Sequence, residues 1–218
     1  MLLKRYARAI FNRVIDLAPR SKEPYATHVP VLVGVAATCK PKLLIEFGAG
    51  SFSTLSFLDE VAFPSLQEVR SYENNKEWFE QIRERSHHSS RVNLQYIEGD
   101  MYRAVASANV ADADMIFLDD SPTAETRVPT VKEVSRLCGE RPIVILHDYE
   151  LWRLRLAARK FENCVAFDTF HPQCCAVWHG HPGRRPILEN VNRTIRQHAS
   201  DISLADIRGW GDIFARAN

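Results

Sequence analysis

Acidic and imidazole side chains follow five strand-like runs of the sequence, each at the point where the run ends. These side chains are Glu46, Glu73, Asp100, Asp119 and the pair His147-Asp148. Carboxylates accept hydrogen bonds from hydroxyl and ammonium groups, and an imidazole exchanges a proton near neutral pH. In open α/β sheets, ligands bind outside the carboxyl ends of the strands. We therefore expect these side chains to converge on one crevice where a ligand is bound and a proton can be transferred.

A glycine-containing turn follows the first of these runs. Residues 43–47 lead directly into Gly48-Ala49-Gly50, and glycines permit a tight turn and close approach of the backbone to a ligand. The third glycine of the dinucleotide fingerprint is missing, because Ser53 occupies its position. Glu46 stands two residues before the first glycine, where a carboxylate would repel a pyrophosphate. The sign of the charge favours S-adenosylmethionine (SAM), which carries an ammonium and a sulfonium and no phosphate, over NAD(P).

Strand-like and helical stretches alternate through the middle of the chain. The strand-like runs are 43–47, 68–73, 93–100, 114–120 and 142–148. The helical stretches are about 53–61, 75–86, 128–139 and 150–162. This alternation predicts βαβ units and a mostly parallel sheet. Two further runs, 164–170 and 174–180, are joined by three residues, a connection so short that they must pair antiparallel. We expect a Rossmann-like α/β fold whose doubly wound sheet has five parallel strands and an antiparallel terminal hairpin, seven strands in all.

Length, charge and cysteine usage limit the number of domains and the kinds of partner. The 218 residues suit one domain, and the net charge of +1 gives no global field that would attract nucleic acid. No apolar run approaches the roughly 20 residues that span a bilayer, so we expect no transmembrane segment. The five cysteines lack CxxC spacing. They favour reduced thiols in a cytoplasmic protein over a disulfide framework or a zinc site.

The two ends of the chain carry no strand signal. Residues 1–20 have apolar side chains on one face and basic ones largely opposite. This pattern is typical of a helix that caps its own domain or a partner subunit, and a membrane surface is the alternative. We expect a helical cap at 1–40, a ligand-binding domain at 41–180 and an extension at 181–218, loop-like in its first part and helical in its second. The extension would shape the substrate site or a subunit interface, and a homodimer is left open.

The run from about Pro41 to Gly180 resembles the class I SAM-dependent methyltransferases. The motifs that carry the resemblance are Glu46-Phe47-Gly48-Ala49-Gly50 with Ser53-Thr54, Tyr72-Glu73, Glu98-Gly99-Asp100, residues 114–119 and the hairpin 164–180. The resemblance implies that Gly48 and Gly50 pack on the amino-acid end of SAM, in a turn shared with Glu46, Ser53 and Thr54. It further implies that Glu73 holds the ribose, that Asp100 lies near the adenine, and that Asp119 lies beside the methyl donor.

The strands at 114–120 and 142–148 resemble those of small-molecule O-methyltransferases of the catechol and caffeoyl-CoA type. In that group, carboxylates after the fourth and fifth strands and a following asparagine bind a divalent cation. Asp119 and Asp148 match two of these ligands, but Tyr149 occupies the asparagine position. The lysine base expected a few residues after Asp119 is missing as well. A Mg²⁺ ion held by Asp119 and Asp148 is therefore left open.

His147 offers another way to deprotonate an acceptor hydroxyl. We expect a catalytic group of His147, Asp148 and Asp119, with Asp120 or Asp148 orienting the imidazole. The alternative is a hydrogen-bonded strand-end histidine with no catalytic part. The favoured function is methylation of a small molecule, with an oxygen as the acceptor atom. An NAD(P)-dependent oxidoreductase and a SAM-binding protein without turnover remain the rivals.

Overall fold

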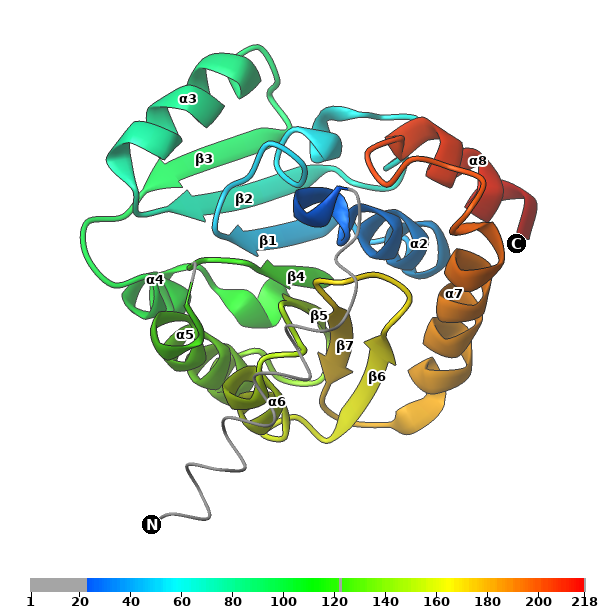
Figure 1. Ribbon diagram of the computed structural model, residues 1–218. Coiled ribbons are helices and arrows are strands. Elements are labelled where there is room, and N and C mark those ends of the chain that lie inside the picture. The colour runs from blue at the N-terminus through cyan, green and yellow to red at the C-terminus, as the bar shows by residue number, and fades with distance from the viewer. Residues whose placement is uncertain (1–22, 122, 218) are drawn as a thin grey trace, which may run out of the picture.

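The computed structural model describes residues 23–121 and 123–217, which build one seven-stranded sheet covered by helices (Figure 1). The strands are β1 (Leu43–Phe47), β2 (Glu68–Glu73), β3 (Val92–Tyr96), β4 (Met115–Leu118), β5 (Ile143–His147), β6 (Asn163–Phe167) and β7 (Cys174–Trp178). Their order across the sheet is β3-β2-β1-β4-β5-β7-β6. Strands β1 to β5 pair in parallel, whereas β7 is antiparallel to both β5 and β6. The predicted Rossmann-like sheet with its terminal hairpin is confirmed.

The central strands are apolar because helices cover both faces of the sheet. In β1, Leu44 packs into one core and Ile45 into the other. Neighbouring residues of a strand point to opposite faces, and in β7 Cys174 and Cys175 likewise enter different cores. The same alternation directs His147, at the end of β5, toward the face on which Ile145 packs.

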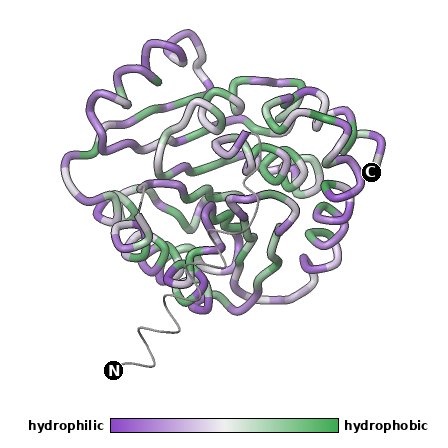
Figure 2. The backbone as a smooth tube through the Cα atoms, in the orientation of Figure 1, coloured by the Kyte–Doolittle hydropathy of each residue, from purple (hydrophilic) through white to green (hydrophobic). Residues whose placement is uncertain are grey.

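The helices form one layer on each face. The first layer contains α2 (Val29–Cys39), α7 (Arg185–His198) and α8 (Ile207–Ala217), which share a core with the sheet. The second contains α4 (Tyr102–Ser107), α5 (Ala124–Leu137) and α6 (Trp152–Ala158). Helix α3 (Lys76–Ser86) lies beside β3 at the edge of the sheet. Figure 2 shows that α2 is largely hydrophobic, whereas α3 is largely hydrophilic. Short 3-10 helices are η1 (Pro24–Ala26), η2 (Ser56–Leu58), η3 (Val110–Asp112) and η4 (Pro182–Arg184).

The helix predicted at 53–61 is wrong. Turns and the short η2 follow the glycines instead. Side chains in this segment hydrogen-bond to nearby groups and compete with a helical ladder. Ser56 Oγ donates to the Phe52 carbonyl at 2.5 Å, and Asp59 Oδ1 accepts from the N–H groups of Val61 and Ala62 at 2.9 and 3.0 Å.

The loop predicted for the first part of the C-terminal extension is also wrong, because α7 occupies most of it. Pro186 lies in the first turn of α7, where its missing N–H costs nothing. Leu188, Val191 and Ile195 are buried at helical spacing. The helix predicted for the second part is confirmed by α8. Helix α5 begins four residues before the predicted start at 128, with Thr123 as its N-cap. Helix α4 was not predicted.

Other sequence-based expectations concern the termini, the membrane and the cysteines. The amphipathic helix predicted for residues 1–20 lies outside the described residues. In the part of the chain that the structure describes, no helix combines the length and the apolar character needed to cross a bilayer. All five cysteines are free thiols.

Candidate functional site

The turn after β1 packs directly against the end of β4. Gly48 has a φ of +94°, which other residues rarely adopt. A Cβ atom on Gly48 would lie 2.3 Å from the Asp119 carbonyl oxygen and 2.6 Å from the Asp120 Cα. Glycine is therefore required here both for its conformation and for the close approach. The turn predicted to hold the cofactor and the strand end that carries Asp119 are in contact.

Glu46 supports this turn from within the protein. The residue has no exposed surface, and its Oε2 accepts hydrogen bonds from Thr54 Oγ1 at 2.6 Å and from Ser71 Oγ. Thr54 Oγ1 in turn accepts the Gly50 N–H at 2.9 Å. Burial raises the pKa of Glu46 to about 7, although its hydrogen bonds to Ser53 and other hydroxyls oppose the shift. Glu46, Ser53 and Thr54 are all buried, so they hold the turn in shape, and a direct cofactor contact stays a prediction for each.

The predicted ribose and adenine residues lie at the ends of the two adjacent strands. Glu73 is 6% exposed, and its Oε1 accepts the N–H groups of Asn74 at 2.9 Å and Asn75 at 2.7 Å. Burial raises the pKa of the Glu73 carboxyl, although nearby backbone N–H groups, including that of Ala49 in the glycine turn, oppose the shift. Glu73 thus lies beside the turn. Asp100, in contrast, is exposed on the loop after β3, and its role near an adenine stays a prediction.

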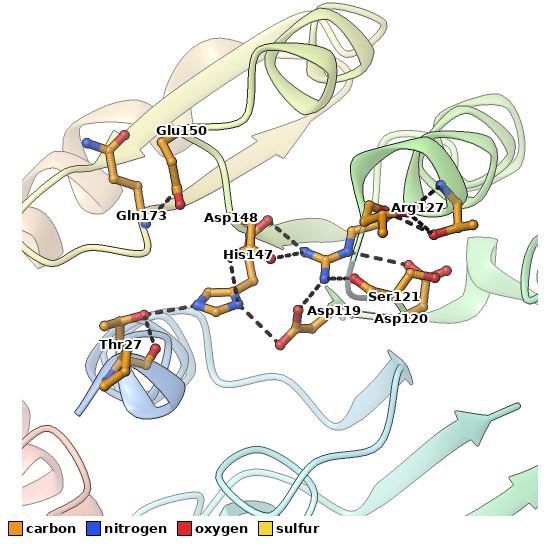
Figure 3. Close-up of polar contacts among 12 residues, drawn as sticks. Thr27, Asp119, Asp120, Ser121, Arg127, His147, Asp148, Glu150 and Gln173 are labelled. Carbon is orange, nitrogen blue, oxygen red and sulfur yellow. Dashed lines mark hydrogen bonds and ion pairs between the residues drawn. The ribbon is translucent and has the colours of Figure 1, made fainter. Parts of the chain in front are cut away.

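Arg127 of α5 lies between the carboxylates that follow β4 and β5 (Figure 3). Its Nη2 is 2.7 Å from Asp119 Oδ1, its Nη1 is 3.0 Å from Asp148 Oδ2, and its Nε is 3.9 Å from Asp120 Oδ1. The Arg127 residue is 2% exposed. It also donates to the His147 carbonyl at 3.1 Å and to the Ser121 carbonyl. We call Arg127 and these three aspartates the Arg127 cluster.

Sequence reasoning missed Arg127 because the predicted helix started at 128. The available signal was the N-cap. If Thr123 is taken as the cap, Arg127 shares a helix face with Thr130, Val131 and Val134, all of which are buried.

His147 connects the Arg127 cluster to the start of α2. Its Nδ1 lies 3.2 Å from Asp119 Oδ2 and 3.8 Å from Asp148 Oδ1, and its Nε2 lies 2.9 Å from Thr27 Oγ1 (Figure 3). Burial lowers the pKa of His147, but the Asp119 and Asp148 carboxylates, Asp119 the stronger, together outweigh burial, so the pKa is raised overall. Burial opposes ionisation of Asp119 too, yet His147 and Arg127 hold the pKa of that carboxyl well below its ordinary value. Asp119 is therefore the main partner of the imidazole.

Asp120 and Asp148 play different parts from Asp119. Asp120 Oδ2 accepts from Thr130 Oγ1 at 2.7 Å, and burial raises the pKa of Asp120 to about 7. Asp148 has a φ of 56°, an uncommon conformation for a residue with a side chain. Non-glycine residues held in this region are often found at functional sites.

The residues at the predicted Mg²⁺ position do not fit a divalent ion between Asp119 and Asp148. The guanidinium of Arg127 already lies against both carboxylates. Tyr149, at the asparagine position, has its hydroxyl 3.5 Å from Cys164 Sγ, and it packs against the core on the α4–α6 face. Arg127 supplies a positive charge at the position where the sequence left a metal ion open.

His28, at the start of α2, is a further buried imidazole that the sequence did not predict. It is 4% exposed, and its ring centroid lies 5.0 Å from those of both His147 and Phe117. Burial, aided by His147, lowers the pKa of His28 to about 3, so the ring is neutral. The Phe52 carbonyl lies near enough to act on this pKa, but neither ring nitrogen makes a hydrogen bond of good geometry to any residue in 23–121 or 123–217.

Comparison with known proteins gives matches at the level of structure. No protein-family model matches the sequence, and no curated protein matches it either. A Staphylococcus aureus structure described as a caffeoyl-CoA O-methyltransferase is 14% identical, with a TM-score of 0.55 over 83% of this chain and 100% of that one. Human methyltransferase-like protein 13, in complex with SAH, is 15% identical, with a TM-score of 0.53 over 84% and 94%.

A neighbour with a different activity has the same arrangement of strands and helices. Spermidine synthase from Thermotoga maritima is 14% identical, with a TM-score of 0.55 over 86% of this chain and 76% of that one. At such identities the likeness concerns the fold alone. The seven-stranded sheet, its reversed β7 and these neighbours agree, and the chain has the fold of the class I SAM-dependent methyltransferases.

Proposed function

We propose that the protein is a SAM-dependent methyltransferase that methylates a hydroxyl group of a small molecule. The observation that carries the proposal is the double role of Asp119. Its backbone packs against the Gly48 turn, and its side chain holds His147. A cofactor seated on the turn would therefore lie beside a group able to accept a proton. The methyltransferase neighbours of this fold support the choice of cofactor.

In the proposed reaction, the acceptor oxygen approaches the methyl group in line and loses its proton. We assign the His147 tautomer that carries its proton on Nδ1, the nitrogen 3.2 Å from Asp119 Oδ2, which leaves a lone pair on Nε2. In this tautomer the Thr27 hydroxyl, 2.9 Å from Nε2, would donate to it in place of the longer 3.4 Å bond to the Pro24 carbonyl. When the acceptor binds, its hydroxyl passes the proton to Nε2, and Asp119 stabilises the imidazolium that forms. Arg127 keeps Asp119 ionised for this purpose.

The cofactor contacts follow the predicted positions. Gly48 and Gly50 would pack on the amino-acid end of SAM, Glu73 would accept hydrogen bonds from the ribose hydroxyls, and Asp100 would lie near the adenine. We do not include a Mg²⁺ ion between Asp119 and Asp148, because Arg127 pairs with both. The five free thiols support a reducing, cytoplasmic location.

Calorimetric titration and turnover assays test the proposal. The protein should bind SAM and S-adenosylhomocysteine, and a panel of phenols and alcohols should contain a methyl acceptor. With that acceptor, His147→Ala should lower turnover about 10²- to 10⁴-fold and leave SAM affinity within about twofold. Exposed His88→Ala is the matched control and should change neither. Equal turnover in His147→Ala and the unaltered protein would remove His147 from the mechanism.

The same titrations separate the rival functions. Tight binding of NAD(P)H without binding of SAM would show an oxidoreductase. Binding of SAM without methyl transfer to any acceptor of the panel would favour a SAM-binding protein that lacks turnover.

A further inference from the structure

We propose that His28, Asp119 and His147 form a binding site for a divalent first-row transition metal ion such as Zn²⁺. One ligand atom from each of the three residues lies within 4.8 Å of the other two. His147 Nδ1 and Asp119 Oδ2 are 3.2 Å apart, near the ~3.3 Å that separates two ligands of one tetrahedral zinc. The inference goes beyond the proposed function, because the ion binds the protein alone and needs neither SAM nor an acceptor.

The strongest sign of a missing ligand is the state of His28. Its side chain is buried, yet within the part of the chain that the structure describes neither ring nitrogen makes a hydrogen bond of good geometry. Buried polar groups in folded proteins nearly always have a partner, and an exception often marks an unseen water or ion. A metal ion bound to His28 would use the lone pair of one ring nitrogen.

The surroundings of the two imidazoles match those of metal ligands. A ligating histidine usually directs its second ring nitrogen to an oxygen, which fixes the ring. For His147 this oxygen is Thr27 Oγ1, 2.9 Å from Nε2. For His28 the nearby Phe52 carbonyl can take this part. The His28 ring also packs against Phe117, at 5.0 Å between centroids, so both rings are held before an ion arrives.

The ligand set also indicates which ion would bind. Two imidazoles and one carboxylate suit Zn²⁺ and its neighbours in the first transition row, whereas Mg²⁺ prefers oxygen ligands. The Asp119 side chain is 26% exposed, which leaves one side of the site open to water or another ligand. Arg127 pairs with Oδ1 of Asp119, and Oδ2 faces His147.

The metal-bound state would differ from the state that performs the proposed reaction. An ion on Nδ1 of His147 keeps the proton on Nε2, so His147 cannot accept a second proton. His147 can therefore bind the metal ion or accept a proton from the acceptor, but it cannot do both at once.

Metal titration of EDTA-treated protein tests the site. The exposed neighbours His87 and His88, whose rings lie 5.8 Å apart, could bind zinc adventitiously, so we would use the His87→Gln/His88→Gln protein as the starting point. It should bind one Zn²⁺ per chain by calorimetry, and one Co²⁺ with the visible absorption of a site containing nitrogen ligands. Further replacement of His28 by Gln, or separately by Phe, should weaken binding on the order of 100-fold or more, because even residues that only support metal ligands cost 10- to 100-fold.

Asp148→Asn is the matched control, because Asp148 is adjacent to the site but is not one of its three ligands. The Zn²⁺ affinity of this variant should stay within about tenfold of that of the starting protein. A loss of about tenfold is the smallest effect expected when a group that supports a metal ligand is removed. Circular dichroism of each variant verifies that it is folded. The proposal is overturned if the starting protein binds no Zn²⁺, or if both folded His28 variants bind it as tightly as the starting protein. Loss of binding in Asp148→Asn alone would also overturn it, in favour of an ion between Asp119 and Asp148.

Discussion

Replacing Glu46 by glutamine should change how the stability of the protein depends on pH. The Glu46 carboxyl is completely buried, and its pKa is raised from 4.5 to about 7. The folded protein therefore retains this proton at pH values where the unfolded chain has released it. A raised carboxyl pKa gives stability that is present below pH 4.5 and is lost as the pH rises through about 7. Glutamine has the shape of the protonated carboxyl and stays neutral, so Glu46→Gln removes this loss.

The magnitude follows from the two pKa values. Between pH 5 and pH 8, the wild-type protein should lose roughly 2.5 kcal/mol of unfolding free energy relative to Glu46→Gln. Asp120, whose pKa is also about 7, titrates in both proteins and cancels from the comparison. Urea unfolding followed by circular dichroism at the two pH values measures the difference. Exposed Glu77→Gln in α3 is the control and should follow the wild-type profile.

Two results would refute this account of Glu46. One is that the wild-type protein and Glu46→Gln have parallel pH profiles, which would mean that Glu46 is ionised in the folded state. The other is that Glu46→Gln is the less stable protein at pH 8. The hydrogen bonds from Thr54 and Ser71 would then stabilise a charged carboxylate that glutamine cannot replace.

Five further substitutions, in three comparisons, test other parts of the structure by urea or thermal unfolding. Gly48→Ala should cost about 3 kcal/mol or more, because it combines a positive φ with a backbone clash. Gly139→Ala, with a φ of +63° and no atom of a described residue beyond its chain neighbours within 4 Å of the new Cβ, should cost only about 1 kcal/mol. Arg127→Met should cost about 3–5 kcal/mol because it leaves buried carboxylates unpaired, and the loss should be smaller at pH 5 than at pH 8. Gly34→Ala should cost about 1–3 kcal/mol, because its Cβ would lie 2.5 Å from Phe214 Cζ, and Phe214→Leu should recover part of the loss. Equal costs for Gly48→Ala and Gly139→Ala would contradict the first expectation, and an unchanged stability of Arg127→Met would contradict the second. Additive effects of Gly34→Ala and Phe214→Leu would contradict the third.

The sheet could be predicted from the sequence because its strands carry strong local signals. β5 is an almost wholly apolar run, and this composition indicates burial on both faces. The three-residue connection between the predicted runs 164–170 and 174–180 allows one pairing geometry only, and in the structure the longer connection 168–173 joins the same antiparallel pair. The segment after Gly50 gave a misleading signal, since its hydroxyl side chains bond locally and prevent the expected helix. Helix α7 was not predicted because most of its residues are polar and its apolar face is short.

The site could be predicted in part, namely in the strand-end residues that topology brings to one edge. Asp119 and His147 do interact, as expected from parallel strands that end side by side. The partners that come from helices could not be placed in the same way. Arg127 depends on where α5 begins, and His28 depends on how α2 packs against the sheet. The start of α5 does have a local signal, the Thr123 N-cap, whereas the packing of α2 is tertiary and no local pattern of residues contains it.

The absence of an α-helix after Gly50 affects the electric field at the turn. The first turn of a full helix carries about half a positive elementary charge, and in many nucleotide-binding proteins that charge attracts a phosphate. Here the backbone dipoles beyond the glycines are not aligned over such a length, while the Glu73 carboxylate stands at the rim. The turn therefore attracts an anion such as pyrophosphate less strongly, and it repels a cation such as a sulfonium less strongly. The lack of a helix after Gly50 would then favour a cationic ligand over an anionic one.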